Sequence, residues 1–80
     1  MKDKNAEKMV AELIRLFQAE RQKQGLSYQQ LAEISGIHRT TISLIERNMQ
    51  NPTVLICKKL ANALQVSFAE FVKKAERKSY

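Results

Sequence analysis

The fold is decided by residues 25–47, which read GLSYQQLAEISGIHRTTISLIER. Apolar residues at helical spacing lie on both sides of Gly36 and predict two helices joined by a tight turn. Ser27 with a glutamine three residues later is a capping-box pattern, which starts the first of these helices. Gly36 supplies the left-handed backbone conformation that such a turn requires. Ile42 and Ile45 lie one turn apart and are expected to lock the second helix onto the first.

The other face of this second helix carries two guanidinium groups, two hydroxyl groups and one leucine. These residues are Arg39, Thr40, Ser43, Leu44 and Arg47, at positions i, i+1, i+4, i+5 and i+8. That spacing makes one continuous helical face, and we expect the face, with its leucine, to be exposed. The alternative interpretation is an ordinary solvated surface without a function.

The same signals, followed outward along the chain, predict short helices and no strand. Gly25 and Asn48 are expected as left-handed stop residues. Thr53 and Ser67 are expected N-caps, with Glu70 completing a second capping box. In the first helix, Met9, Val10, Leu13 and Phe17 form the apolar stripe, flanked by Ile14 and Leu16. The fold class is therefore all-α, one domain over residues 1–80, with helices at about 6–24, 28–35, 38–47, 54–64 and 68–77.

The charge of the chain indicates what kind of partner the protein binds. The 80 residues carry 14 Lys+Arg and 8 Asp+Glu, a formal net charge of +6 with the single His neutral. Such an excess favours polyanionic partners, nucleic acid before a membrane surface. A secretory signal has an apolar run after its charged start, and no such run follows the first five residues of this chain. No uncharged stretch approaches the ~20 residues that span a bilayer, so we expect a cytoplasmic protein.

Enzymatic chemistry finds little support in the sequence. One His and one Cys, together with scattered carboxylates, supply no catalytic triad, no metal-ligand set and no glycine-rich phosphate loop. Cys57 has no partner for an internal disulfide, and we expect it to be buried as a small apolar residue rather than to act as a redox switch. We therefore expect no enzyme, no cofactor and no metal.

At this point a family resemblance is plain. Residues 25–47, followed by Asn-Pro-Thr at 51–53 and Lys-Leu-Ala-Asn-Ala-Leu-Gln-Val-Ser at 59–67, resemble the phage repressor/Cro-type (xenobiotic-response-element) helix-turn-helix regulators. Residues 38–43 also resemble the small controller proteins of restriction–modification systems. The resemblance implies a compact five-helix DNA-binding domain with its helix-turn-helix at the second and third helices. It also implies a two-fold dimer that lays each third helix in the major groove.

The resemblance further implies roles for individual residues. The base-facing set is Arg39, Thr40, Ser43 and Leu44, and the phosphate-facing set is Ser27, Tyr28, Gln29, His38, Thr41, Arg47 and Asn51. Arginine suits guanine, and leucine suits a thymine methyl group. For His38, a solvated histidine with neither a phosphate bond nor a pH-sensing role stays open. Arg21 and Glu46 match a structural pair that bridges the first and third helices, although an ordinary exposed ion pair would contribute little.

Two positions depart from the family pattern. Gln65 stands where the family has glycine, so a tighter or differently capped turn is expected between the fourth and fifth helices. Leu55 and Ile56 stand where the family is commonly polar, and with Phe68 they are expected to form a dimer interface. This expectation assumes that the inward residues of the fourth helix are Val54, Cys57, Leu60, Ala61 and Leu64. The alternative is that the three apolar residues belong to an irregular core, to which Phe71 and Val72 are also assigned.

The sequence thus predicts a sequence-specific, double-stranded-DNA-binding transcriptional regulator of the repressor or Cro-like kind. It would act as a homodimer on a near-palindromic site, without a small-molecule effector and without a membrane. The alternative function is an antitoxin or anti-regulator module that acts mainly through protein–protein contacts at Leu55, Ile56 and Phe68.

Overall fold

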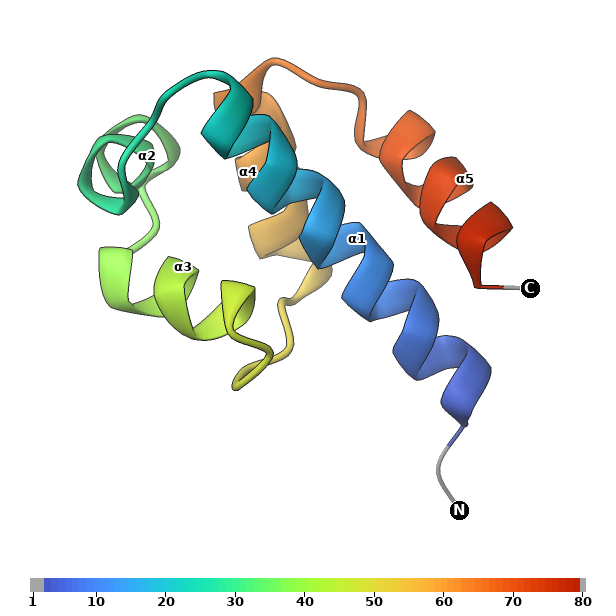
Figure 1. Ribbon diagram of the computed structural model, residues 1–80. Helices are drawn as coiled ribbons and strands as arrows, with labels where there is room; N and C mark the ends of the chain where they lie inside the picture. Colours follow the sequence, from blue (N-terminus) through green and yellow to red (C-terminus); the bar gives the residue numbers. More distant parts are fainter. Residues whose placement is uncertain (1–2, 80) are drawn as a thin grey trace.

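The computed structural model describes residues 3–79, and this part of the chain holds five α-helices and no strand (Figure 1). They are α1 (Lys4–Lys23), α2 (Tyr28–Ser35), α3 (Arg39–Glu46), α4 (Val54–Leu64) and α5 (Phe68–Lys78). The predicted all-α class is confirmed, and every predicted helix is present with ends shifted by two residues at most. The predicted domain over 1–80 includes residues 1, 2 and 80, which lie outside the described range. No helix in that range has the length and apolar character needed to span a bilayer.

Side-chain caps explain where the first two helices begin. α1 starts two residues before the predicted position because the Asp3 carboxylate accepts a hydrogen bond from the backbone N–H of Ala6 at 3.1 Å. α2 starts with the predicted capping box. The Ser27 hydroxyl accepts from Gln30 N–H at 3.1 Å, and the Gln30 side-chain oxygen accepts from Ser27 N–H at 2.8 Å. The start of the helix-turn-helix segment is therefore fixed locally.

The last two helices have simpler caps. The Thr53 hydroxyl accepts from Ile56 N–H at 3.1 Å, and the Ser67 hydroxyl accepts from Glu70 N–H at 3.2 Å, so both predicted N-caps are confirmed. The predicted second capping box is wrong in one half, because between these two described residues the Glu70 carboxylate makes no return bond to the Ser67 backbone. Ser67 alone fixes the start of α5.

Left-handed residues follow or end four of the helices, including α2, which ends at Gly36. Gly25 follows α1 with φ of 70°, Asn48 follows α3 with φ of 59°, and both were predicted at these places. Gln65 ends α4 with φ of 59°, and Val66 N–H donates to Ala61 O at 3.0 Å to close the turn. The predicted tighter or differently capped corner is therefore wrong: glutamine adopts the same left-handed geometry that glycine adopts at low cost.

The core forms where α1 crosses the middle of the molecule. α2 and α3 lie on one side of α1 and α5 on the other, with α4 behind it in the view of Figure 1. Phe17 of α1 meets Phe71 of α5 with ring centroids 5.2 Å apart in a tilted arrangement. The buried residues of α1 are Leu13, Ile14 and Phe17, so Ile14 is in the core rather than flanking it, while Val10 is only half-buried. Met9, Leu16 and Val72 pack against the core at its margin.

α4 contributes the predicted inward residues with one exception. Cys57, Leu60, Ala61 and Leu64 are all buried, whereas Val54 is 75% exposed. Val54 lies in the first turn of α4, at the edge of the core, so helical spacing alone does not bury it. The predicted burial of Cys57 is confirmed, and this burial raises the pKa of its thiol.

Candidate nucleic-acid interface

The α2–α3 unit, residues 28–47, is anchored by apolar side chains on its inner face. Leu31 and Ile42 are each 2% exposed, Ile45 is 3% exposed, and Ile37 in the turn is also buried. Gly36 adopts φ of 73° between the two helices, as the turn requires. The predicted locking of α3 by its two isoleucines is confirmed, and the opposite face of α3 is consequently turned outward.

The outer face of α3 presents its polar residues around a shallow hollow. Arg39, Thr40, Ser43 and Arg47 line this hollow, which has a volume of about 290 Å³. Arg39, Thr40 and Arg47 are exposed, and Ser43 is half-buried. Leu44 is also half-buried, so the prediction of an exposed leucine is wrong. The reason is geometric: Leu44 follows roughly 100° around the helix from Ser43 and borders the buried side that holds Ile45.

His38 occupies the N-cap of α3 rather than its first helical turn. Its Nδ1 accepts a hydrogen bond from the backbone N–H of Thr40 at 3.2 Å, while the side chain stays exposed. Sequence reasoning missed this cap because histidine is outside the usual N-cap set of Ser, Thr, Asp and Asn. The position one residue before the helix was the only available signal.

The N-terminus of α2 brings together Ser27, Tyr28 and Gln29. Ser27 and Gln29 are exposed, and the Gln29 side-chain amide donates to Glu33 at 3.4 Å. Tyr28 differs from both, because its ring is half-buried under the Arg21 guanidinium, 4.5 Å from carbon to ring centroid. Burial, with a contribution from the nearby negative Glu46, raises the pKa of Tyr28. Tyr28 is thus tied to α1 and α3 as well as placed at the helix start.

Arg21 and Glu46 are brought together across α1 and α3. Arg21 Nε donates to Glu46 Oε2 at 2.8 Å and Nη2 donates to Oε1 at 3.0 Å, which is a two-pronged pair. Arg21 Nη1 also donates to the backbone oxygen of Leu26 at 2.7 Å. The side chains are only 12% and 6% exposed, so this is not an ordinary surface ion pair. Hydrogen bonding to Glu46 raises the pKa of Arg21.

The remaining predicted phosphate contacts are Thr41 in the first turn of α3, Arg47 at its end and Asn51 in the loop after it. Thr41 is half-buried, and Arg47 is exposed as the C-cap of α3. Asn51 is exposed in the loop before α4, where it lines a groove of about 560 Å³ against α1. Asn48 borders this groove and also the next pocket along α1. Arg47 and Asn51 lie at the C-terminal end of α3, whereas Thr41, in its first turn, lies towards the end that Ser27, Gln29 and His38 border.

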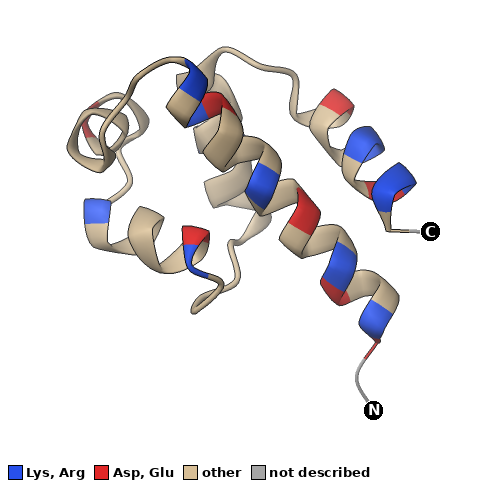
Figure 2. Cartoon of the chain, in the orientation of Figure 1, with Lys and Arg blue, Asp and Glu red and all other residues tan. Residues whose placement is uncertain are grey.

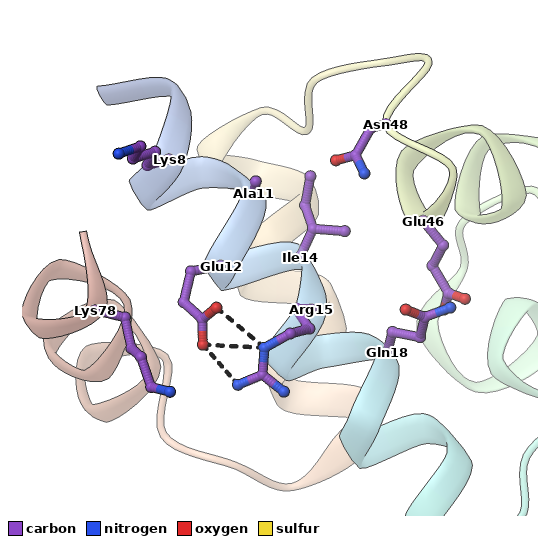
Figure 3. Close-up of a pocket in the computed structure, with 9 residues that line it drawn as sticks. All are labelled: Lys8, Ala11, Glu12, Ile14, Arg15, Gln18, Glu46, Asn48 and Lys78. Atoms are coloured by element: carbon purple, nitrogen blue, oxygen red, sulfur yellow. Dashed lines mark hydrogen bonds and ion pairs between the residues drawn. The ribbon is translucent and has the colours of Figure 1, made fainter. Parts of the chain in front are cut away.

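A second pocket, of about 440 Å³, lies between α1, the end of α3 and α5 (Figure 3). Its lining is Lys8, Ala11, Glu12, Ile14, Arg15, Gln18, Glu46, Asn48 and Lys78. Arg15 binds Glu12 at 2.6 Å and lowers the pKa of that carboxyl. The other carboxylate of the pocket, that of Glu46, is bound by Arg21. Both acidic groups are therefore already engaged by guanidinium groups.

The predicted dimer residues do not share one environment. Leu55 is 64% exposed, whereas Ile56 and Phe68 are half-buried and pack against the core. Next to Leu55 in the sequence, Val54 is exposed to an even greater extent. The strongly exposed apolar residues among these are therefore those of the first turn of α4, Val54 and Leu55.

Charge is distributed unevenly over the molecule. In the α2–α3 unit, Arg39 and Arg47 balance Glu33 and Glu46, so its formal net charge is zero with His38 neutral. The whole formal charge of +6 resides in the rest of the chain. Figure 2 shows basic segments along α1 and α5, interspersed with acidic ones. The outer face of α3 itself carries the guanidinium groups of Arg39 and Arg47, whereas Glu46 is bound by Arg21 and Glu33 lies on α2.

Comparisons with known proteins agree with this geometry. The chain is 40% identical over 52 residues to the HTH-type transcriptional regulator SutR of Escherichia coli, covering 65% of this chain and 29% of SutR. It is 52% identical over 42 residues to the control protein C.SmaI of Serratia marcescens, covering 52% of this chain and 50% of that protein. An HTH_3 family transcriptional regulator from Vibrio cholerae superposes with a TM-score of 0.69 at 26% identity, over 88% of this chain and 38% of that one.

The chain thus spans from less than a third to half of the length of these relatives. They are named as regulators and not as enzymes. The helix-turn-helix family HTH_3 matches residues 17–71, from the middle of α1 to the first turn of α5. This match contains the α2–α3 unit, both of its caps and the Arg21–Glu46 pair. The chain belongs to the HTH_3 family of helix-turn-helix domains.

Proposed function

We propose that this chain is a transcriptional regulator that binds double-stranded DNA sequence-specifically, with α3 in the major groove. The observation that carries the proposal is the outward face of α3, which presents Arg39, Thr40 and Ser43 on a helix anchored from behind. An α-helix fits the major groove, where each base pair presents a distinct pattern of donors, acceptors and methyl groups. The names of the relatives support the same role for this chain.

In this proposal Arg39 reads guanine, Leu44 contacts a thymine methyl group through its exposed portion, and Thr40 and Ser43 supply hydroxyl contacts. The two ends of α3 face phosphates. Ser27, Tyr28, Gln29, His38 and Thr41 serve the strand at one end, and Arg47 and Asn51 serve the strand at the other end. Phosphate contacts fix the position of α3, and base contacts specify the sequence.

We place the homodimer contact at Leu55, Ile56 and Phe68. An exposed leucine beside an exposed valine, rising from half-buried neighbours, is the kind of patch that marks an interface. A two-fold dimer would bind a near-palindromic site with half-sites about one helical turn, ~10 bp, apart.

Selection of bound duplexes from a random pool tests the proposal directly. The wild type is expected to return a near-palindromic consensus, and Arg39→Ala is expected to lose preference at one base step of each half-site while keeping general DNA binding. Affinity is also expected to fall by orders of magnitude between low and physiological salt. A pool without consensus, or an unchanged consensus for Arg39→Ala, contradicts the assignment.

A second candidate function rests on the same exposed apolar turn. An antitoxin or anti-regulator module would use Leu55 and Val54, exposed by 64% and 75%, to hold another polypeptide. Light scattering after size exclusion separates the two functions. A homodimer that Leu55→Glu converts to a monomer supports the regulator, whereas a monomer that associates only with a different polypeptide supports the module.

A further inference from the structure

His38 is held in one orientation by the backbone of α3. Its own backbone is extended, with φ of −59° and ψ of 138°, and its Nδ1 lies 3.2 Å from the nitrogen of Thr40. The backbone N–H of Thr40 can only donate, so Nδ1 of His38 must be the acceptor. The imidazole therefore caps the helix through the lone pair of Nδ1.

This bond fixes the proton of the ring. A neutral imidazole has one N–H and one acceptor nitrogen, and an imidazolium has two donors and no acceptor. Since Nδ1 acts as the acceptor, the capped ring is neutral and carries its proton on Nε2. The cap thus leaves one N–H donor on the far side of an exposed ring.

The surroundings place that donor beside other proposed DNA contacts. His38 lines a hollow of about 450 Å³ at the α2–α3 turn, together with Gln29 from the start of α2 and Arg39 from the start of α3. The charged groups of this hollow are Glu33 on α2 and Arg39 on α3, one of each sign. Together α2 and α3 therefore add no net charge at this point.

We propose that His38 binds a DNA phosphate as a neutral donor through Nε2–H while Nδ1 caps α3. The inference rests on the proposed function and deepens it, because it assigns the protonation state of one contact. A cationic side chain that neutralises a phosphate releases counterions, which steepens the dependence of affinity on salt. A neutral N–H adds a directed hydrogen bond and leaves the salt dependence unchanged.

The test compares salt dependences of binding to the selected duplex. His38→Asn keeps a good N-cap but has a shorter side chain whose carboxamide is held at the cap. The affinity of this variant for the duplex is expected to fall about fivefold, as for one lost hydrogen bond. Its plot of log Kobs against log [salt] is expected to run parallel to that of the wild type, and its thermal midpoint is expected to stay unchanged. Arg47→Gln is the matched cationic control, and its slope is expected to decrease by about 0.9.

His38→Ala separates the two roles of the ring, because it loses the cap as well. It is expected to show the same loss of affinity as His38→Asn together with a lower thermal midpoint. Nitrogen-15 NMR of the bound protein is expected to show Nδ1 unprotonated and Nε2 protonated.

Three results would overturn the inference: a shallower slope for His38→Asn, an unchanged affinity of that variant, or an imidazolium in the complex. Failure of the proposed function looks different, because Arg39→Ala would then leave the consensus unchanged and Arg47→Gln would leave the salt dependence unchanged.

Discussion

The α2–α3 unit and the helices that support it use charge in opposite ways. The unit is formally neutral over residues 28–47, whereas the rest of the chain carries the entire charge of +6. The unit is nevertheless firmly held by the supporting helices, since its inner isoleucines are almost completely buried and Glu46 is bound by Arg21 of α1.

This difference separates two contributions to DNA binding. Long-range attraction to a polyanion depends on total charge and is screened within about 10 Å at 0.1 M salt. Base recognition depends on where a few donors and acceptors lie. In the proposed complex the supporting helices would provide the first contribution and the placement of α3 the second. Both parts of the comparison can be tested by substitution.

The largest effect is expected where the unit joins its support. Ile42→Ala removes a side chain that is 2% exposed and leaves a cavity between α3 and the core. We expect a loss of about 3–4 kcal/mol in the free energy of unfolding. Urea denaturation followed by circular dichroism measures it. Thr40→Ala on the outer face of the same helix is the control, and an equal loss in both variants would show that α3 is not anchored through Ile42.

Glu46→Ala is expected to be the next most damaging change. It removes the carboxylate that binds Arg21 and leaves a largely buried guanidinium with fewer partners. We expect a loss of about 3 kcal/mol of unfolding free energy and a weaker consensus in duplex selection, because α3 loses its tie to α1. Glu33→Ala makes the same change of charge on the exposed side of α2 and is expected to unfold like the wild type. If both variants were equally stable, the α1–α3 pair would have no positioning role.

Gln65→Gly tests the left-handed turn at the end of α4, one of the helices that support the α2–α3 unit. Glutamine holds φ of 59° at the end of α4, a conformation that costs a non-glycine residue about 1 kcal/mol. The glycine variant is therefore expected to be more stable by up to ~1 kcal/mol, with the entropy of the unfolded chain offsetting part of the gain. Its thermal midpoint should rise while its DNA affinity and consensus stay unchanged. A lower midpoint would mean that the Gln65 side chain contributes more than the turn strain costs.

The smallest expected effect concerns charge within the unit. Glu33→Ala gives the α2–α3 unit a formal net charge of +1 and removes one negative side chain from the hollow shared with His38 and Arg39. We expect affinity for the consensus and for unrelated duplexes to rise together, by about threefold at low salt. Fluorescence anisotropy on both duplexes measures this. A gain confined to the consensus would assign Glu33 to base discrimination instead.

The regular parts of the fold could be predicted from the sequence. The helical spacing of apolar residues and the capping residues predict α2, the turn at Gly36 and the burial of Ile42 and Ile45 on α3. These features depend on residues within one or two helical turns of each other. The pairing of Arg21 with Glu46 came from a family resemblance and not from spacing, since 25 residues separate them in the chain. Its burial could only be seen in the structure.

The predictions that were wrong lie at helix ends. Val54 has the spacing of an inward residue but is exposed, and Leu44 has the spacing of an outward residue but is half-buried. In the first or last turn of a helix, exposure depends on which neighbouring elements cover that turn. His38 and Gln65 hold a cap and a left-handed turn that their residue types do not favour. Local propensity is a weak constraint at such positions, and tertiary packing decides the conformation.

The hydrogen bond between Asn5 and Ser79 makes the protein suitable for circular permutation. The Asn5 side-chain amide donates to the backbone oxygen of Ser79 at 3.0 Å, so the start of α1 and the end of α5 are neighbours. A short glycine-rich bridge could therefore join them, and the backbone could be cut instead in the exposed stretch at 49–51. A circularly permuted protein that begins with α4 and ends with α3 would keep every helix in place, with the recognition surface at its new C-terminus.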